Sequence, residues 1–464
     1  MDQYKTFKNF YDLCQKVADG FELSWKQSGE QEKQQRLEQE KRAIMGYQKE
    51  MDDYKVRIKK MINEEPMSSY TQCPPWYQSL EDGIFAELYG LAGIAPWAYD
   101  ATEEYKSSSS AKIIGDRIYC LIDGRSKLQP QRISYDRRQQ LKRALLMAYP
   151  RERIEKGFHE VYLRNGIRIT IYSGEKTKEG QDVMVFRKYI VRELTFEKLA
   201  ALGTIPADGV ELFKTMVRLG FNVLFIGQVR AGKTVFMQTW QRYERADLEG
   251  LAISTDPETP WHQIMPDAPI MQIVADGNEL GAVSKSMLRG DNDYILLEEM
   301  RDADAFRLAV DITSAGTQRT KATIHAGSAQ DVPYKMASAI TARYGGSEKG
   351  IIAQIYRNFH YAFELCQLPD NRAKKILKTI SEYRYDTVTD RISVNEICRY
   401  DYETGRWRWK YDIGEDKKEM GKMQPEEFKK MDRMLKMLQS RNPIMENTVI
   451  YPRYYNGGDN KNAR

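Results

Sequence analysis

Short apolar runs alternate with longer amphipathic stretches over residues 194–412, and this alternation gives the first structural prediction. The runs predicted to be strands are 222–226, 251–254, 294–297 and 322–324. The stretches predicted to be helices are 207–219, 233–243, 279–289 and 302–314. Further strands are predicted at 375–385, 394–400 and 407–411. Because strands that alternate with helices build a parallel sheet covered on its faces, this part of the chain is predicted to be an α/β domain.

The first half of the chain has a different pattern. Residues 1–64 are rich in Glu, Lys, Gln and Arg with thinly spaced apolar positions, which predicts either a solvent-exposed helix or a weak coiled coil that docks on something else. Residues 76–192 combine extended runs with one helical stretch at 135–147. The extended runs are 112–114, 117–122, 160–163 and 167–172. Asn165 and Gly166, between the last two runs, predict a β-hairpin.

These changes of pattern predict four regions along the 464 residues. The predicted regions are a charged helical extension (1–65), a mixed α/β domain (66–196), a second α/β domain (197–412), and a C-terminal helix with a disordered tail (413–464). A chain of this length is too long for one simple core, which agrees with more than one domain.

Composition narrows the cellular setting. Lys and Arg number 71 and Asp and Glu 66, so net charge gives no case for nucleic-acid binding, and direct contact with DNA is not expected. No apolar run approaches the ~20 residues that span a bilayer, and the first residues lack the features of a signal peptide. The five cysteines are scattered, which argues against a zinc site or a disulfide framework. We therefore predict a protein of the reducing cytoplasm.

Residues 227–234 fit the phosphate-binding pattern G-x-x-x-x-G-K-[ST]. The segment follows the predicted strand 222–226 and opens a predicted helix, so its backbone N–H groups and the positive end of the helix would face the same anion. Lys233 would reach the β- and γ-phosphates, and the Thr234 hydroxyl would bind Mg²⁺. The residues predicted to bind a nucleoside triphosphate are Gly227, Gln228, Val229, Arg230, Ala231, Gly232, Lys233, Thr234 and Val235.

Carboxylates and a histidine follow two other predicted strands. Glu298 and Glu299 end the run 294–297, and His325 ends the run 322–324. The carboxyl ends of parallel strands meet at one edge of a sheet, where ligands bind, so these side chains are expected near the phosphate loop. Two simpler interpretations stay open: an acidic strand end that faces water, and a hydrogen-bonded structural histidine.

These segments, in this order, resemble those of the ATPases of type II secretion, type IV pilus assembly and type IV secretion. They are most like the branch that serves tight-adherence pili and type IV secretion. The segments that match the family's second box, histidine box, acidic box and three upstream boxes are 295–302, 315–326, 255–258, 165–168, 186–188 and 194–199. The resemblance covers roughly residues 84–412, and its strength lies in the order of the boxes rather than in any one of them.

The resemblance implies an α/β fold: a RecA-like P-loop ATPase core, a mixed α/β N-terminal domain and an added N-terminal helical segment. It implies ATP and Mg²⁺ as cofactors, Glu299 as the catalytic glutamate, and Lys233 and His325 as further catalytic residues. Arg168 and Arg187 are expected to reach the nucleotide from the N-terminal domain. The alternative for each, taken singly, is a salt bridge within the hairpin. The residues expected to hold Mg²⁺ are Thr234, Glu298 and Asp256.

The resemblance further implies a cytoplasmic homohexamer that drives protein secretion or pilus assembly. It would associate with the inner face of the plasma membrane through an inner-membrane platform protein. Two alternatives stay open: a motor that supports DNA transfer in conjugation, and a nucleotide-binding scaffold with little hydrolysis. Three departures motivate the scaffold. Arg230 and Ala231 stand where the family favours Gly and Ser, and Thr255 and Thr317 replace a glutamate and a histidine.

Overall fold

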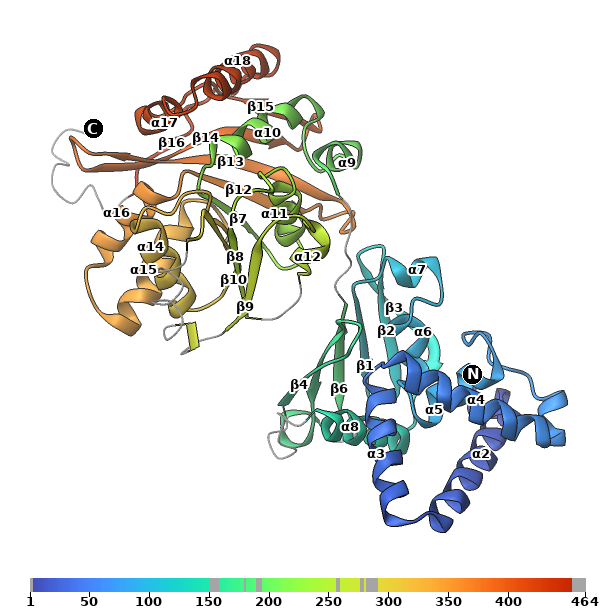
Figure 1. The fold of residues 1–464 in the computed structure, drawn as a ribbon. Coiled ribbons are helices and arrows are strands. Elements are labelled where there is room, and N and C mark those ends of the chain that lie inside the picture. Colours follow the sequence, from blue (N-terminus) through green and yellow to red (C-terminus); the bar gives the residue numbers. More distant parts are fainter. Residues whose placement is uncertain are drawn as a thin grey trace. The chain divides into compact units, whose positions relative to one another are not determined.

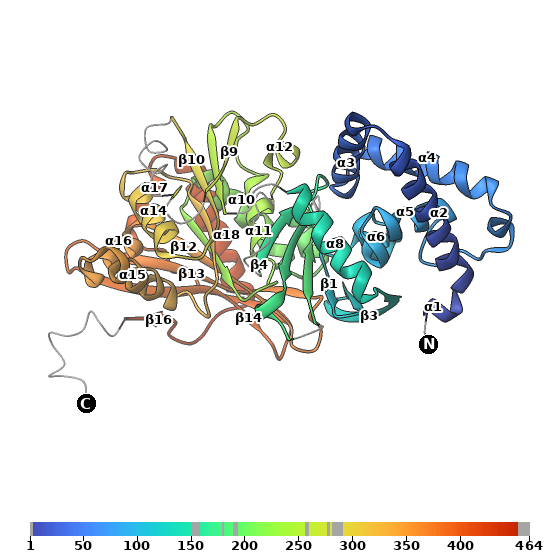
Figure 2. The ribbon, with the colours of Figure 1, turned by 90° about the horizontal axis from the view of Figure 1, so that it is seen from below.

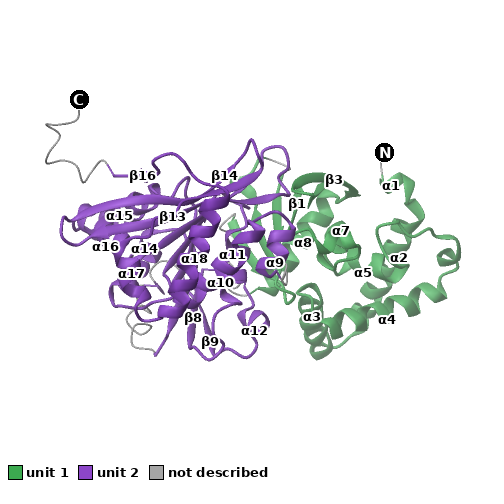
Figure 3. Ribbon diagram, turned by 90° about the horizontal axis from the view of Figure 1, so that it is seen from above, with its two compact units in different colours: residues 1–190 green, residues 191–464 purple. Residues whose placement is uncertain are grey.

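The computed structural model describes residues 3–149, 158–178, 181–188, 194–255, 259–275, 279–280 and 291–452. The chain divides into two compact units, residues 1–190 and 191–464 (Figure 1; Figure 3). Most of the predicted helix 279–289 and the predicted tail after residue 452 lie outside the described residues. Among the helices that are described, none is both long and apolar enough to cross a membrane.

The first unit begins with helices that pack on one another. They are α1 (Gln3–Thr6), α2 (Lys8–Gln27), α3 (Glu30–Ile44), α4 (Gln48–Glu64), η1 (Pro66–Tyr70) and α5 (Leu80–Leu88). Phe10 of α2, Ile58 of α4 and Phe85 of α5 are buried in one hydrophobic cluster. Helices α2 and α4 thus each bury an apolar face within this unit, whereas most of α3 is exposed.

An antiparallel sheet forms the rest of the first unit, in the order β3-β2-β1-β6-β5-β4. Its strands are β1 (Ser110–Ile114), β2 (Arg117–Ile122), β3 (Arg125–Arg132), β4 (Phe158–Tyr162), β5 (Arg168–Tyr172) and β6 (Val183–Arg187). The helical segments are η2 (Ala92–Ile94), α6 (Ala95–Ala98), α7 (Glu103–Lys106), α8 (Tyr135–Ala148) and η4 (Gly174–Lys176). The sequence did not predict β3, because this edge strand contains Pro130 and is mostly exposed. The predicted hairpin is formed by β4 and β5.

The second unit is built on a larger sheet of the order β15-β14-β13-β12-β7-β11-β10-β8-β9. Its strands are β7 (Val223–Gly227), β8 (Gly250–Ser254), β9 (Ile270–Val274), β10 (Tyr294–Met300), β11 (Lys321–Ile324), β12 (Tyr361–Gln367), β13 (Lys375–Asp386), β14 (Arg391–Asp401), β15 (Arg406–Trp409) and β16 (Val449–Ile450), the last paired with β14. The neighbouring strands β12, β7, β11, β10, β8 and β9 are parallel. Strands β13, β14 and β15 continue the sheet beyond β12 and are antiparallel. The chain thus has the α/β, RecA-like architecture that the sequence predicted.

Helices cover both faces of this sheet (Figure 1; Figure 2). They are α9 (Phe196–Ala201), η5 (Ala207–Gly209), α10 (Val210–Leu219), α11 (Lys233–Gln241), α12 (Trp261–Ile264), α14 (Ala303–Ser314), α15 (Asp331–Tyr344), α16 (Glu348–Asn358), α17 (Glu415–Gly421) and α18 (Pro425–Arg441). Strand β7 supplies Val223 and Phe225 to the core under α10 and α11, and Leu224 and Ile226 to the core under α14, α15 and α16. Burial on both faces explains why β7 is a continuous apolar run.

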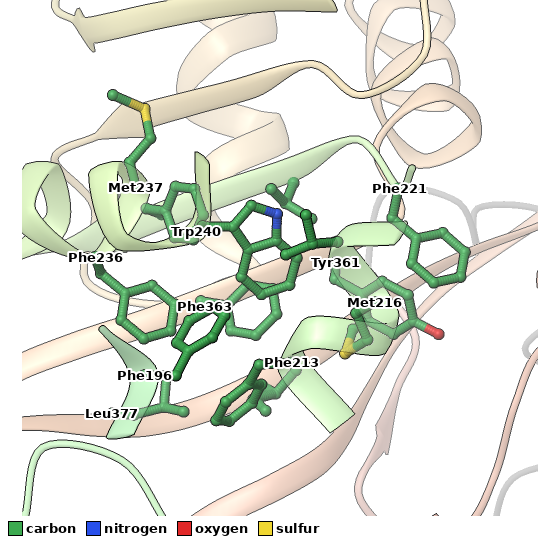
Figure 4. Packing of buried hydrophobic residues seen from close by; sticks show 14 of the residues in the cluster. Phe196, Phe213, Met216, Phe221, Phe236, Met237, Trp240, Tyr361, Phe363 and Leu377 are labelled. Atoms are coloured by element: carbon green, nitrogen blue, oxygen red, sulfur yellow. The ribbon is translucent and has the colours of Figure 1, made fainter. Parts of the chain in front are cut away.

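Aromatic rings dominate the core beside α11 (Figure 4). Phe225 of β7 and Phe363 of β12 lie against Phe236 and Trp240 of α11, with the Trp240 and Phe363 rings 4.8 Å apart. Phe213 of α10 completes the contact with Phe236 and Phe363. Each such ring buries a large apolar area, so this packing fixes the position of α11 against the sheet and, with it, the loop that precedes the helix.

Candidate nucleotide-binding site

The loop between β7 and α11 has glycine where only glycine fits. Gly227 has φ 143°, and a Cβ built there would lie 2.2 Å from the backbone oxygen of Leu365 on the neighbouring strand β12. Gly232, which precedes α11, has φ 94°. Both backbone conformations are rare for residues with a Cβ. The two glycines of the sequence pattern are therefore required by the turn and by the close approach of β12.

Arg230 at the tip of the loop takes a left-handed backbone conformation, with φ 65°. Arg230 stands at the position where the ATPases that the sequence resembles favour glycine. A side chain in this region costs roughly 1–2 kcal/mol, so the loop carries strain that glycine would not. The neighbouring Ala231 is fully buried in the core, whereas Gln228, Val229 and Arg230 are exposed. The exposed residues form the surface of the loop.

Lys233 at the start of α11 is turned inward and is only 6% exposed. Its ammonium donates to the backbone oxygens of Gly227 (3.1 Å) and Gln228 (3.0 Å) and to Nδ1 of His325 (3.0 Å). Burial lowers the pKa of Lys233 to about 8; the carboxylate of Glu299 opposes the shift and the charge of Lys335 adds to it. All three donors of the ammonium thus have partners within the protein, and a bound phosphate would have to replace some of them.

Glu299 lies in a β-bulge near the end of β10. Burial would raise its pKa, but the hydrogen bond and charge of Arg301, and the contact with His325, lower the pKa to about 2. Arg301 Nη2 lies 2.6 Å from Glu299 Oε2. The residue has φ 54°, a conformation that costs about 1–3 kcal/mol for a residue other than glycine and that is concentrated at functional sites. Glu299 is therefore an ionised carboxylate on a strained backbone.

His325 connects Lys233 to Glu299. Its Nε2 lies 3.1 Å from Glu299 Oε1, and its Nδ1 accepts from the Lys233 ammonium. An ammonium can only donate, so Nδ1 must be the acceptor and Nε2 carries the proton that points to the carboxylate. Glu299 lies on β10, His325 directly follows β11, and Lys233 follows β7 after the phosphate loop. These three strands are parallel and adjacent in the sheet. The structure thus brings together three residues that the sequence singled out separately.

The chain is similar to known proteins over part of its length. Residues 176–406 match the family model described as Type II/IV secretion system protein. The chain belongs to this family. An uncharacterized protein of Bacillus anthracis is 22% identical over 241 residues, which are 49% of this chain and 52% of that protein. The chain therefore spans about half the length of this curated relative.

Three solved structures of secretion and pilus ATPases are similar to the chain. The VirB11 ATPase of the Brucella suis type IV secretion system is 16% identical, with 62% of this chain and 92% of that chain covered and a TM-score of 0.33. The pilus retraction motor PilT with bound ADP is 17% identical, covering 59% and 77%, with a TM-score of 0.44. The ATPase DotB of Legionella pneumophila is 14% identical, covering 76% and 93%, with a TM-score of 0.44.

The second carboxylate of the family box, Glu298, has a different environment from Glu299. Its Oε1 accepts a hydrogen bond from Trp261 Nε1 of α12, and its backbone lies opposite Ser254 of β8. The described contacts that join Glu299, His325 and Lys233 do not include Glu298. The two neighbouring glutamates of this secretion-family chain therefore bind different partners: Glu298 binds Trp261, and Glu299 contacts His325 and Arg301.

The residues predicted to hold Mg²⁺ are only partly described. Asp256 lies outside the described residues. Within the described parts of the chain, no three His, Cys, Asp or Glu side chains converge as a metal site would require. Mg²⁺ in nucleotide sites is held by one or two protein oxygens together with phosphates and waters. The half-buried Thr234 supplies a hydroxyl in the second position of α11, which suits that chemistry.

Arg168 and Arg187, predicted to reach the nucleotide, belong to the first unit. They lie directly opposite each other on β5 and β6, where Arg168 is buried and Arg187 is exposed. Their predicted role in nucleotide binding stays a prediction.

Sequence reasoning missed three residues that contact the site. Arg301 binds the Glu299 carboxylate, and Lys335 of α15 donates to the backbone oxygen of His325. Thr323 of β11 accepts a hydrogen bond from the Glu299 backbone. Arg301 and Thr323 stand within the family boxes, so the boxes were a signal for both. Lys335 stands on a helix that the sequence did not predict, and no pattern pointed to it.

Proposed function

We propose that this chain is an Mg²⁺-dependent ATPase that powers a secretion or pilus-assembly machine. The observation that carries the proposal is the contact series Lys233–His325–Glu299, which lies beside the phosphate loop at the carboxyl edge of a parallel sheet. Membership of the type II/IV secretion family supports it. Further roles follow from the resemblance: a cytoplasmic hexamer that acts at the inner face of the plasma membrane through a platform protein.

The proposed chemistry begins when the phosphates of ATP meet the backbone N–H groups of the loop and the N-terminus of α11. Lys233 leaves its carbonyl partners for the phosphates and at the same time loses His325. The imidazole of His325, no longer bound to Lys233, then links the bound terminal phosphate to Glu299. The ionised Glu299 orients or deprotonates the attacking water. The Thr234 hydroxyl would hold Mg²⁺, which would neutralise charge on the phosphates.

The scaffold alternative has its own support in the strained Arg230 and in the ion pair that Arg301 makes with Glu299. An arginine on the carboxylate makes it a weaker base, which would slow hydrolysis. This alternative predicts tight nucleotide binding with negligible turnover.

Steady-state ATP hydrolysis tests the proposal. Wild-type protein should turn over ATP as a ring-sized species in light scattering, and Lys233→Ala should abolish turnover because it removes the ammonium that is proposed to leave its carbonyl partners for the phosphates. Binding without turnover in the wild type would favour the scaffold. A rate that rises with added DNA would favour a motor for DNA transfer, and absence of nucleotide binding would refute the site.

Nucleotide affinity should depend on pH through Lys233. Its pKa is lowered to about 8 in the free protein, and contact with phosphate would raise it, because an opposite charge favours the protonated form. Above pH 8, nucleotide binding is therefore accompanied by protonation of Lys233. Affinity for ADP should be independent of Lys233 ionisation below pH 8 and should fall up to about tenfold per pH unit above it.

Calorimetric titrations of ADP between pH 6.5 and 9.5 would measure this dependence. Lys233→Arg is the matched control, since arginine stays charged throughout and leaves only the titration of the nucleotide itself. Wild-type affinity that follows the arginine variant across the whole range would contradict the prediction.

A further inference from the structure

The ladder between β10 and β11 is interrupted at Glu299. Leu297 lies opposite Ala322 and Met300 lies opposite Ile324, so three residue steps on β10 face two on β11. One residue is therefore extra on β10, and the φ of 54° at Glu299 accommodates it. Bulges of this kind re-aim a side chain relative to the regular alternation of a strand.

The bulge leaves the Glu299 N–H without a regular ladder partner, and one side chain supplies the acceptor. The N–H donates to Thr323 Oγ1 at 2.8 Å. Thr323 is 1% exposed, so water does not offer an easy replacement. A buried N–H without an acceptor is unfavourable, and the Thr323 hydroxyl therefore stabilises the conformation in which Glu299 is left-handed.

Strand β11 carries this hydroxyl, and the residue directly after the strand carries the imidazole that meets the carboxylate. Thr323 binds the backbone of Glu299, and His325, two residues later, lies 3.1 Å from its Oε1. Arg301 occupies the other carboxylate oxygen at 2.6 Å. Thr323 is the member of this set that touches Glu299 without touching its carboxylate. Its effect on the carboxylate must pass through the backbone.

We infer that Thr323 is a positioning residue for hydrolysis, an inference that rests on the proposed function. The hydroxyl keeps the bulge in place and so directs the Glu299 carboxylate toward His325 and the phosphate loop. Without it, β10 can relax toward the regular ladder. Because side chains alternate along a strand, a shift of one residue carries a side chain to the other face, and Glu299 would leave the site.

Thr323→Val tests the inference, because valine has the shape of threonine but cannot accept the hydrogen bond. The turnover number should fall about 10- to 100-fold, the effect of a misplaced catalytic group. KM and the affinity for ADP should change less than about threefold, since Thr323 makes no contact with Lys233 or the phosphate loop. Thr323→Ser retains the hydroxyl and should recover most of the turnover.

Thr320→Val is the matched control. Thr320 immediately precedes β11 and is completely buried, and its hydroxyl has no hydrogen-bond partner in the described part of the chain. This substitution should leave turnover unchanged. Thermal unfolding and ADP binding of all three variants report whether each is folded.

The possible outcomes distinguish a failure of this inference from a failure of the proposed function. Wild-type turnover with an equally active Thr323→Val would overturn the inference alone. Equal loss in Thr323→Val and Thr323→Ser, or a rise in KM in place of the fall in turnover number, would also overturn it. A wild-type chain without ATP turnover would refute the proposed function, and this inference with it.

Discussion

Glu299→Gln should lower the rate of ATP hydrolysis by at least about 100-fold, the usual contribution of a general base. Glutamine has the same shape and keeps one acceptor oxygen for either Arg301 or His325, and its backbone N–H can still donate to Thr323, so the bulge and the fold should remain. It has no negative charge with which to orient or deprotonate water. ADP affinity should stay within about threefold of wild type, because the described contacts of Glu299 are with Arg301, His325 and Thr323 and none is with the phosphate loop.

Glu298→Gln gives the comparison that makes this result informative. Both variants remove one carboxylate charge from neighbouring positions of β10, but Glu298 binds Trp261 instead of His325. A loss of equal size at Glu298 would show that the carboxylates share the role or that the assignment to Glu299 is wrong. Little loss in Glu299→Gln, with low turnover in the wild type, would support the scaffold. Single-turnover measurements beside ADP titrations would distinguish these outcomes.

Glu244→Gln should destabilise the second unit by about 3–5 kcal/mol, the usual cost of breaking a buried ion pair from one side. The Glu244 carboxylate binds Arg319 through one oxygen and Lys321 through the other, at 2.7 Å from the Lys321 ammonium. The side chains of Glu244 and Lys321 are each 1% exposed. Burial lowers the pKa of Lys321, and the Glu244 carboxylate opposes that shift. Glutamine would leave a buried ammonium without its counter-charge.

Urea unfolding of the variant measures this loss of stability. Glu244→Leu combined with Lys321→Met should be less destabilised than Glu244→Gln, because it removes the buried ammonium as well as the carboxylate. Asp247→Asn is the control for charge alone: its ion pair with Arg245 is exposed, and no measurable change is expected. A Glu244→Gln variant as stable as the control would show that Lys321 finds another partner or loses its proton.

The limits of the sequence are clearest in the antiparallel part of the second unit and in its missed helices. Strands 375–385, 394–400 and 407–411 were predicted, and β13, β14 and β15 occupy nearly the same residues. Strand β12 and helices α15 and α16 were not predicted. These elements lie in the core, and segments distant in the sequence bury them. Strand β12 pairs with β7, and α15 and α16 pack on the face of the sheet opposite α10 and α11.

The sequence by itself determined the local chemistry: a phosphate loop between strand and helix, with acidic residues and a histidine after two later strands. It also determined the family, through the order of its boxes. It could not determine from the residues alone which of Glu298 and Glu299 meets His325, and the resemblance alone selected Glu299.

Only the tertiary structure decided that question. Lys233 and His325 are 92 residues apart, and His325 and Glu299 are 26 apart, yet β7, β11 and β10 are neighbours in the sheet. The bulge at Glu299 depends on the pairing of β10 with β11 and on the Thr323 hydroxyl. The register of a strand is set by the partner beside it, and the sequence of one strand does not specify that partner.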